Sequence, residues 1–269
     1  MDHLNPLDVD ALARSFRSAE PFPYLVLEDF LEPAFARAVA ASYPPFEQAS
    51  QVGLQFTKVN ERRKVQVCDA QLFPPPVKQL ADLVNGPEFL ALLERVTGIP
   101  NLLADETFGG GGIHETAAGG WLDVHVDFNY FEQRNWHRRL NLLIFLNEEW
   151  PEAWGGQFEL WDPEVKRCHR SVVPLLNHAA LFETSQISYH GVQRITCPDG
   201  VYRKSFAAYY YTKEAPAGWD GAKHSTIFRA RPEERWKGLV AMPFEKATDV
   251  ARKLPRRLAR IVRGERRED

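Results

Sequence analysis

The stretch GGWLDVHVDFNYF, residues 119–131, carries two candidate metal ligands two positions apart. Successive side chains of a β-strand point to opposite faces, so His125 and Asp127 share one face if this backbone is extended. A third candidate ligand, His190, follows in the segment SYHGV. Two imidazoles and one carboxylate on one side of an ion leave the opposite coordination positions open, an arrangement that suits Fe(II). An isolated His-x-Asp is a weak signal, because it also occurs in hydrogen-bonded surface loops.

The pattern of apolar and turn-forming residues around these ligands is typical of a β-rich domain. From about residue 103 to residue 213, short apolar runs alternate with Gly, Pro, Asn and Asp. This spacing predicts an antiparallel sandwich or barrel. Before residue 100, the patterns LEPAFARAVAASY and GPEFLALLERVTG predict helices, and PYLVLEDF predicts a strand. The predicted fold class is therefore mainly β with flanking helices.

A candidate anion-binding side chain follows the third ligand. Arg203 opens the alternating segment RKSFAAYYYT and is expected to share a strand face with Ser205. A guanidinium and a hydroxyl on one face suit a carboxylate. Lys204 is the alternative anchor, but neighbouring residues of a strand point to opposite faces, so only one of the two can serve.

The order of these segments resembles the 2-oxoglutarate and Fe(II)-dependent dioxygenases, in particular the branch similar to prolyl 4-hydroxylases. The matching segments occur in the order of the family over residues 100–213. They are HVD, FLN followed by Trp and GGQFEL, PLLNHAALF, YHGV, and Arg-x-Ser. The resemblance implies a double-stranded β-helix, or jelly-roll, core.

The resemblance also implies a chemistry. His125, Asp127 and His190 would bind Fe(II), and Arg203 would pair with the distal carboxylate of 2-oxoglutarate. The cofactors would be Fe(II), 2-oxoglutarate and O2, with ascorbate as a candidate reductant. The usual outcome in the family is hydroxylation of a C–H bond, with release of succinate and CO2. The substrate would be a small molecule or a peptidyl side chain such as proline.

Two features bear on how far the family pattern extends. Phe145 stands where the better-known prolyl hydroxylases have tyrosine, so specificity for prolyl substrates does not follow from the resemblance. Halogenating relatives replace the carboxylate of the triad with Gly or Ala. Asp127 is present here, which favours hydroxylation over halogenation.

Further candidates for the cosubstrate pocket come from neighbouring strands. His114 is expected to project into the pocket and to hydrogen-bond the cosubstrate or an iron ligand. Strand alternation puts Arg139 and Asn141 on one face with Phe145, so Asn141 is a candidate for the cosubstrate site. An exposed outer face for this set and a purely structural role for His114 are the alternatives.

Three aromatic residues follow the HVD segment closely. Tyr130, Phe131 and Trp136 are candidates for a lid or a substrate wall, with aromatic core packing as the alternative.

Composition excludes several classes of protein. The sequence has 269 residues, 44% hydrophobic and 26% charged, which is typical of a folded domain. No apolar run is long enough for a membrane span, and the first residues lack the order of a signal peptide, so a cytoplasmic location is expected. The three widely spaced cysteines favour reduced thiols over disulfides or a thiolate zinc site.

The charge of the chain is distributed unevenly. The net charge is −3, but residues 251–269 hold eight basic and three acidic side chains, so the preceding part is acidic. Nucleic acid is therefore not expected as a partner. The segment LPRRLARIVRG, residues 254–264, predicts an amphipathic basic helix that packs on the body, with membrane contact as the less favoured alternative. The oligomeric state does not follow from the sequence.

We expect one oxygenase domain over residues 1–240, followed by a basic helix or tail over residues 241–269. Within the domain, residues 1–100 would support the core, residues 101–213 would form the β-helix with its metal site, and residues 214–240 would pack against it. Two alternatives remain at this stage. One is a hydrolase that binds zinc through the same three ligands. The other is a non-catalytic jelly-roll binding protein.

Overall fold

The computed structural model of the chain describes residues 2–234 and Trp236. The segment 241–269, for which the sequence predicts a basic helix or tail, lies outside the described residues, and the proposed division of the chain at residue 240 stays a prediction. Among the residues that are described, no helix is both long enough and apolar enough to cross a bilayer.

The α-helices of the described part precede most of the β-strands. In chain order they are α1 (Val9–Ser18), α2 (Pro33–Ala41), α3 (Phe46–Val52), α4 (Pro75–Asn85) and α5 (Pro87–Thr97). Short 3₁₀ turns are η1 (Ala70–Leu72), η2 (Glu152–Trp154) and η3 (Pro232–Glu234). Both helices predicted from apolar spacing before residue 100 are confirmed as α2 and α5. Gly98 ends α5 in the left-handed conformation with φ of 76°, which glycine adopts without strain.

The strands are mostly short and pair antiparallel. They are β1 (Tyr24–Leu27), β2 (Leu54–Thr57), β3 (Glu61–Val67), β4 (Leu103–Ala104), β5 (Gly112–Val126), β6 (Tyr130–Phe131), β7 (Trp136–Phe145), β8 (Phe158–Trp161), β9 (Cys168–Val172), β10 (Ala179–Glu183), β11 (His190–Val192), β12 (Tyr202–Thr212) and β13 (Ile227–Arg229). The central order is β1-β10-β7-β12-β5-β11-β8-β9. In this order, strands that are neighbours in the sheet are often far apart in the sequence. Such crossing connections are typical of a jelly roll and do not occur in a simple meander.

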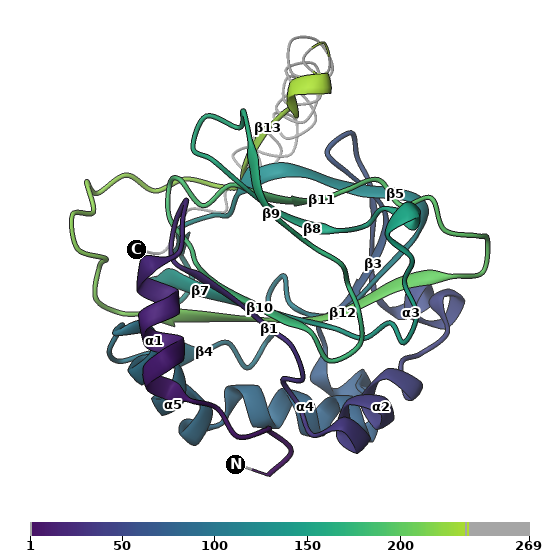
Figure 1. The fold of residues 1–269 in the computed structure, drawn as a ribbon, viewed down its shortest axis with the longest axis horizontal. Helices are drawn as coiled ribbons and strands as arrows, with labels where there is room; N and C mark the ends of the chain where they lie inside the picture. The colour runs from purple at the N-terminus through teal and green to yellow at the C-terminus, as the bar shows by residue number, and fades with distance from the viewer. Residues whose placement is uncertain (1, 235, 237–269) are drawn as a thin grey trace, which may run out of the picture.

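These strands curl into a nearly closed barrel with two facing layers. Figure 1 shows one layer of β11, β8 and β9 above and a second layer of β7, β10, β1 and β12 below. Strand β5 belongs to both layers. Its first half pairs with β12, its second half pairs with β11 and β13, and β3 pairs with parts of both halves. The predicted class, mainly β with flanking helices, is confirmed.

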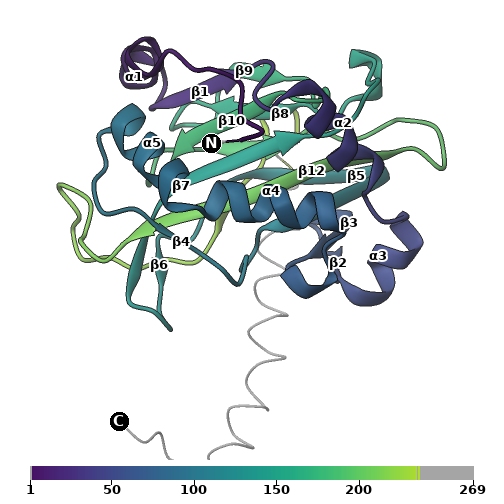
Figure 2. The same ribbon diagram turned by 90° about the horizontal axis from the view of Figure 1, so that it is seen from below.

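The helices bury the outer face of the lower layer. Figure 2 shows α4 and α5 lying across the layer that contains β7, β10 and β12. The largest core cluster joins Leu80 and Phe89 from these helices to Leu142 and Phe206 from the sheet, and all four are almost completely buried. Burial of such a side chain contributes about 1.5–3 kcal/mol. This face is therefore committed to packing, and chemistry is left to the opposite, inner face.

The outer face of β5 carries a buried carboxyl group, that of Glu115. Glu115 lies on the outer face, fully buried, and neither carboxylate oxygen has a hydrogen-bond partner within the described part of the chain. Burial raises the pKa of Glu115 to about 7; Lys204 on the paired strand opposes this shift and Glu47 adds to it. Because the folded state raises this pKa, it favours the protonated carboxyl.

Glu115 is expected to make stability fall as pH rises. Its contribution is lost between the ordinary carboxyl pKa of about 4.5 and the folded value of about 7, because the ionised form is poorly solvated in the fold. The loss amounts to about 2–3 kcal/mol. Glu115→Gln should therefore be the more stable protein at pH 8 in urea unfolding, with little gain at pH 5. Glu106→Gln at an exposed site is the control, and equal slopes of stability against pH in the parent and Glu115→Gln would contradict this account.

Candidate metal and cosubstrate site

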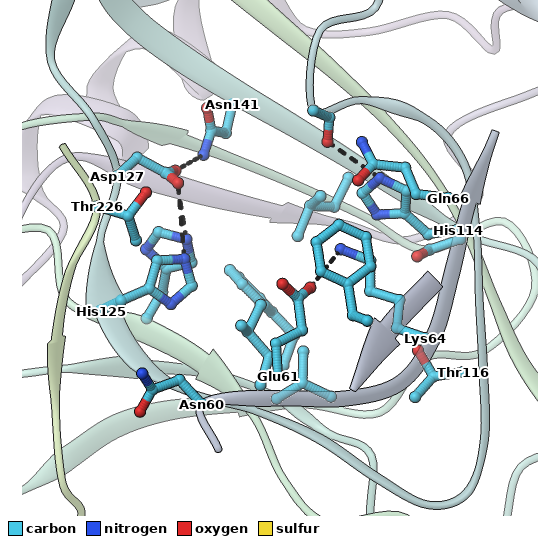
Figure 3. A pocket seen from close by; sticks show the side chains of 18 of the residues that line it. Asn60, Glu61, Lys64, Gln66, His114, Thr116, His125, Asp127, Asn141 and Thr226 are labelled. Carbon is cyan, nitrogen blue, oxygen red and sulfur yellow. Dashed lines mark hydrogen bonds and ion pairs between the residues drawn. The ribbon is translucent and has the colours of Figure 1, made fainter. Parts of the chain in front are cut away.

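The three candidate ligands converge at one end of the barrel. His125 on β5 lies directly opposite His190 on β11 in the strand register, and Asp127 follows the end of β5. One potential ligand atom from each of the three residues lies within 4.8 Å of the others. Figure 3 shows His125 and Asp127 facing the pocket together. Asp127 and His190 lie two and sixty-five positions after His125 in the sequence, and the predicted convergence of the three side chains is present.

Hydrogen bonds to the backbone orient both imidazoles. His125 Nδ1 lies 2.8 Å from the carbonyl oxygen of Asp123, and His190 Nδ1 lies 2.9 Å from that of Ser188. A carbonyl can only accept, so each Nδ1 carries the proton and each Nε2 keeps its lone pair for a metal. Burial, together with the neighbouring His125, lowers the pKa of His190 to about 3. His190 is therefore neutral at physiological pH, as a ligand must be.

Asp127 is held ionised and fixed in place by two side chains of β7. Asn141 donates to Asp127 Oδ2 at 2.7 Å, and Arg138 Nη2 lies 3.2 Å from the same oxygen. Burial opposes ionisation of this carboxyl, but Arg138 and the two imidazoles outweigh it and hold the pKa of Asp127 well below its usual range. Charge compensation by Arg138 thus keeps an anionic ligand in a buried position.

Arg138 is the site residue that sequence reasoning missed. Its guanidinium lies between the rings of Phe128 and Tyr209, 4.7 and 3.7 Å from their centroids. Its Nε donates to Asn141 Oδ1 at 2.9 Å. The prediction that alternation would put Arg139 on the face of Asn141 is wrong, because the pairing of β7 with β12 shifts between Tyr210 and Tyr211. Because of this irregularity, Arg138 rather than Arg139 shares the cavity face with Asn141. Arg139 instead contacts the Glu183 carboxylate and the Thr212 hydroxyl.

Loss of the Asn141 amide is expected to weaken metal binding without abolishing it. Asn141→Ala removes one of the two contacts that orient Asp127, and such supporting groups contribute about 10- to 100-fold to metal affinity. Anaerobic calorimetric titration with Fe(II) measures the change. An affinity equal to that of the parent protein would mean that Arg138 alone fixes Asp127.

Arg203 occupies the pocket floor and has one unsatisfied donor. It is 4% exposed, its Nε donates to the Gly156 carbonyl at 2.6 Å, and its Nη1 lies 3.4 Å from Ser205 Oγ. Its Nη2 is buried and has no hydrogen-bond partner among the described residues. Burial lowers the pKa of Arg203 to about 10, so the guanidinium stays charged at neutral pH. A buried, charged donor without a partner calls for an anionic acceptor.

The local sequence explains why Arg203 sits there. Gly155 and Gly156 both have positive φ, and a Cβ on Gly156 would come within 3.3 Å of the Arg203 side chain. The glycine pair therefore lets the backbone carbonyl approach the guanidinium. Lys204 does not line this pocket; it points to the opposite face, where its ammonium lies 6.0 Å from the ring centroid of Tyr43.

One cavity of about 820 Å³ contains both the triad and Arg203. Asn141, Ser205 and His114, all predicted for the cosubstrate pocket, line it. The donor set fits a divalent metal, since it pairs two neutral imidazoles with a carboxylate, and the unpaired Arg203 Nη2 fits a carboxylate deeper in the same cavity. The residues present thus match both groups that the sequence led us to expect.

His114 faces the cavity but touches no candidate ligand. Its Nε2 lies 3.1 Å from the carbonyl oxygen of Gly110. Burial, with a contribution from Lys64, holds the pKa of His114 well below its usual range, so the ring is neutral. The described structure therefore gives His114 a backbone partner in place of an iron ligand, and a contact with the cosubstrate stays a prediction.

The cavity walls near the triad are aromatic, although not as predicted. Tyr130, Phe131 and Trp136 do not line the cavity, so a substrate wall made of them is wrong. Phe131 and Trp136 pack against Tyr211, and Tyr130 stacks on Trp219. The rings that line the cavity beside the imidazoles are Phe228, whose centroid is 5.2 Å from that of His125, and Phe182, 4.7 Å from His190. Phe228 comes from a segment about one hundred residues after His125, whereas Phe182 lies on the strand that precedes His190.

The match to a family model covers the residues that build this site. Residues 111–211 match the model of the 2OG-Fe(II) oxygenase superfamily. A search of curated proteins finds no match.

Solved structures with the same fold include three prolyl hydroxylases. A prolyl hydroxylase from Trichoplax adhaerens, in complex with a peptide fragment of the hypoxia inducible factor oxygen degradation domain, is 17% identical with a TM-score of 0.54, covering 76% of this chain and 91% of that one. A Pseudomonas putida prolyl-4-hydroxylase is 16% identical with a TM-score of 0.52, covering 75% and 98%. A Phytophthora capsici prolyl 4-hydroxylase is 18% identical with a TM-score of 0.55, covering 88% and 76%.

These comparisons confirm the jelly-roll fold. At this level of identity the solved structures support the fold, while the family model, together with the His-Asp-His cluster, bears on the chemistry. Residues 111–211 therefore match the 2OG-Fe(II) oxygenase superfamily, whose members use Fe(II), 2-oxoglutarate and O2, and the His-Asp-His cluster lies within the matched residues.

Proposed function

We propose that the protein hydroxylates a C–H bond of a small molecule or of a peptidyl side chain, with His125, Asp127 and His190 as the iron ligands. The single observation that carries this proposal is the pairing, within one cavity, of the triad with a buried guanidinium that lacks a partner. A zinc hydrolase needs the triad but has no use for such a guanidinium. A non-catalytic binding protein needs neither.

The side chains would divide the work as follows. Arg203 and Ser205 would bind the distal carboxylate of 2-oxoglutarate and fix its orientation, so that its 2-oxo acid end faces the triad. Asn141 and Arg138 would keep Asp127 ionised and aimed at the metal. Phe228 and Phe182 would exclude water from the imidazoles. Bound Fe(II) would supply the redox chemistry by which O2 oxidises both 2-oxoglutarate, to succinate and CO2, and the substrate C–H bond, to an alcohol.

Phe145 supports a cosubstrate pocket that differs from that of prolyl hydroxylases. Its ring centroid lies 5.2 Å from the Arg203 guanidinium, where it contributes a cation–π contact but no hydroxyl. The cosubstrate would thus be bound with one hydrogen bond fewer than in relatives with tyrosine. Arg203 would carry a larger share of its binding energy.

Succinate formation under defined conditions tests the proposed function. Protein reconstituted with Fe(II) and supplied with ascorbate as the two-electron reductant is expected to convert 2-oxoglutarate slowly to succinate in air, without added substrate, and His190→Ala should abolish this turnover. Anaerobic samples should form none. An absence of iron-dependent succinate formation would contradict the proposal and favour the zinc hydrolase or the non-catalytic alternative, because hydrolysis alone cannot oxidise 2-oxoglutarate to succinate.

A further inference from the structure

Strand β3 contributes to the cavity wall an ion pair that iron and 2-oxoglutarate would leave unused. Lys64 Nζ lies 2.8 Å from Glu61 Oε1, and the two side chains are 13% and 14% exposed. Both line the cavity. Figure 3 shows Glu61 and Lys64 pointing into the open space between His125 and His114.

A regular strand would not put both charges in the cavity. Glu61 and Lys64 are three residues apart on β3, so on an unbroken strand they would point to opposite faces. The pairing of β3 with β5 shifts between them: Arg62 pairs with Trp121, whereas Lys64 pairs with Thr116. The intervening Arg63 has φ of 54°, a left-handed conformation that is unfavourable for a residue with a side chain.

The opposite strand is adapted to this irregularity. Between the two partners on β5, Gly119 has φ of 77° and Gly120 leaves no room for a Cβ, which would come within 2.8 Å of the Arg62 carbonyl oxygen. Bulges that re-aim side chains are frequent beside active sites. The fold therefore accepts local strain at Arg63 in order to present Glu61 and Lys64 together.

The pair has little value as a purely structural contact. Burying two charges costs solvation energy that a single ion pair seldom recovers, and apolar residues at such positions are often as stable or more so. The mutual contact uses one of the three ammonium donors of Lys64 and one of the acceptor positions of Glu61. The Lys64 ammonium also makes a cation–π contact with Phe56, whose ring centroid is 5.1 Å away. The remaining donors and acceptors are available to a ligand in the cavity.

We propose that the Glu61–Lys64 pair is the recognition element for the charged head group of a free amino acid, with the substrate ammonium on Glu61 and its carboxylate on Lys64. This inference rests on the proposed function and selects its small-molecule branch. A residue within a peptide has neither charge on its backbone, so it cannot satisfy this pair. A zwitterion satisfies both members through charge-assisted hydrogen bonds, which are about twice as strong as neutral ones.

The position of the pair is consistent with this role. Lys64, Thr116 and Arg203 lie side by side across β3, β5 and β12 in the strand register. The substrate carboxylate on Lys64 would thus lie toward the cosubstrate, beyond Thr116. Glu61 pairs with Leu122, three residues before His125, so a substrate ammonium on Glu61 would lie on the side of the triad.

The first experiment compares free and capped amino acids. The twenty free L-amino acids and their N-acetyl, C-methylamide derivatives are added separately to Fe(II)-loaded protein with 2-oxoglutarate in air, and succinate is measured above the rate without additive. We expect at least one free amino acid to stimulate succinate formation and to gain one oxygen atom by mass spectrometry. Its capped form should be at least about tenfold less effective.

The second experiment tests the two residues with that amino acid. Glu61→Gln and Lys64→Met should each raise its KM about 10- to 100-fold, with a much smaller effect on the KM for 2-oxoglutarate. The double charge exchange Glu61→Lys with Lys64→Glu retains an ion pair, so it should recover thermal stability but not the low KM. Lys78→Met, which breaks the exposed Lys78–Asp82 pair on α4, is the control and should change neither KM.

Three outcomes would overturn the inference. One is stimulation by capped amino acids or proline peptides but by no free amino acid. Another is an unchanged KM in Glu61→Gln and Lys64→Met, or recovery of the low KM by the charge exchange, since a purely structural pair would behave so. The third is succinate formation that no amino acid stimulates. A complete absence of iron-dependent succinate would instead refute the proposed function itself, and the inference with it.

Discussion

Asp127→Ala is expected to lose at least about 100-fold in Fe(II) affinity and about 1,000-fold in succinate formation. The carboxylate is the one anionic group among the three converging ligands, and alanine leaves only the two neutral imidazoles. Arg138 would also lose the partner that compensates its buried charge. Anaerobic calorimetry with Fe(II) and a succinate assay at saturating iron measure the two effects.

The control for this substitution must separate metal binding from folding. Asp82→Ala removes an exposed carboxylate on α4 and should leave both quantities unchanged. Thermal unfolding of metal-free Asp127→Ala shows whether the fold persists. A folded Asp127→Ala protein with full succinate formation would refute the assignment of the triad.

Arg203→Ala is expected to raise the KM for 2-oxoglutarate by about 10- to 150-fold. A hydrogen bond to a charged group contributes about 1.5–3 kcal/mol, and the buried Nη2 has no other acceptor among the described residues. Fe(II) affinity should change little, because the guanidinium contacts Gly156 and Ser205 rather than any candidate ligand. The KM follows from succinate formation as a function of 2-oxoglutarate concentration.

Lys204 provides the matched control for Arg203. It is the next residue on β12 and carries the same charge, but it lies on the opposite strand face. Lys204→Ala should leave the KM for 2-oxoglutarate unchanged, and Arg203→Lys should restore part of the binding, since lysine keeps the charge but not the forked geometry. A raised KM in Lys204→Ala with none in Arg203→Ala would reverse the assignment.

The sequence was enough to predict those site residues whose shared face depends only on the alternation of side chains along a strand. His125 lies near the end of β5 and Asp127 directly after it, and Arg203 and Ser205 are likewise two residues apart on β12. Their shared faces therefore follow from the two-residue period of extended backbone. The pairing of His190 with His125 is long-range, and only the family resemblance supplied it. The role of Gly155 and Gly156 in admitting Arg203 depends on the three-dimensional approach of β12, which the local sequence does not reveal.

Sequence reasoning led to a wrong prediction, or to none, for residues on strands that depart from regular alternation and for residues brought together from distant segments. A shifted register beside β7 exchanges Arg139 for Arg138, and a second one on β3 brings Glu61 and Lys64 to one face. Both shifts depend on the neighbouring strand. Phe228 reaches His125 because β13 returns to pair with β5, a contact between residues about one hundred positions apart. Tyr130 and Trp136 followed Asp127 closely in sequence, yet the chain turns them away from the cavity.

Anaerobic titration of the purified protein with Fe(II) and 2-oxoglutarate would show whether the triad and Arg203 form one site. We expect a weak visible charge-transfer band that requires both components, saturates near one equivalent of each, and is absent in His190→Ala. The same titration with Arg203→Ala should need a higher 2-oxoglutarate concentration to reach the same band. Iron that binds without producing any band on addition of 2-oxoglutarate, or a band that persists in His190→Ala, would contradict the site.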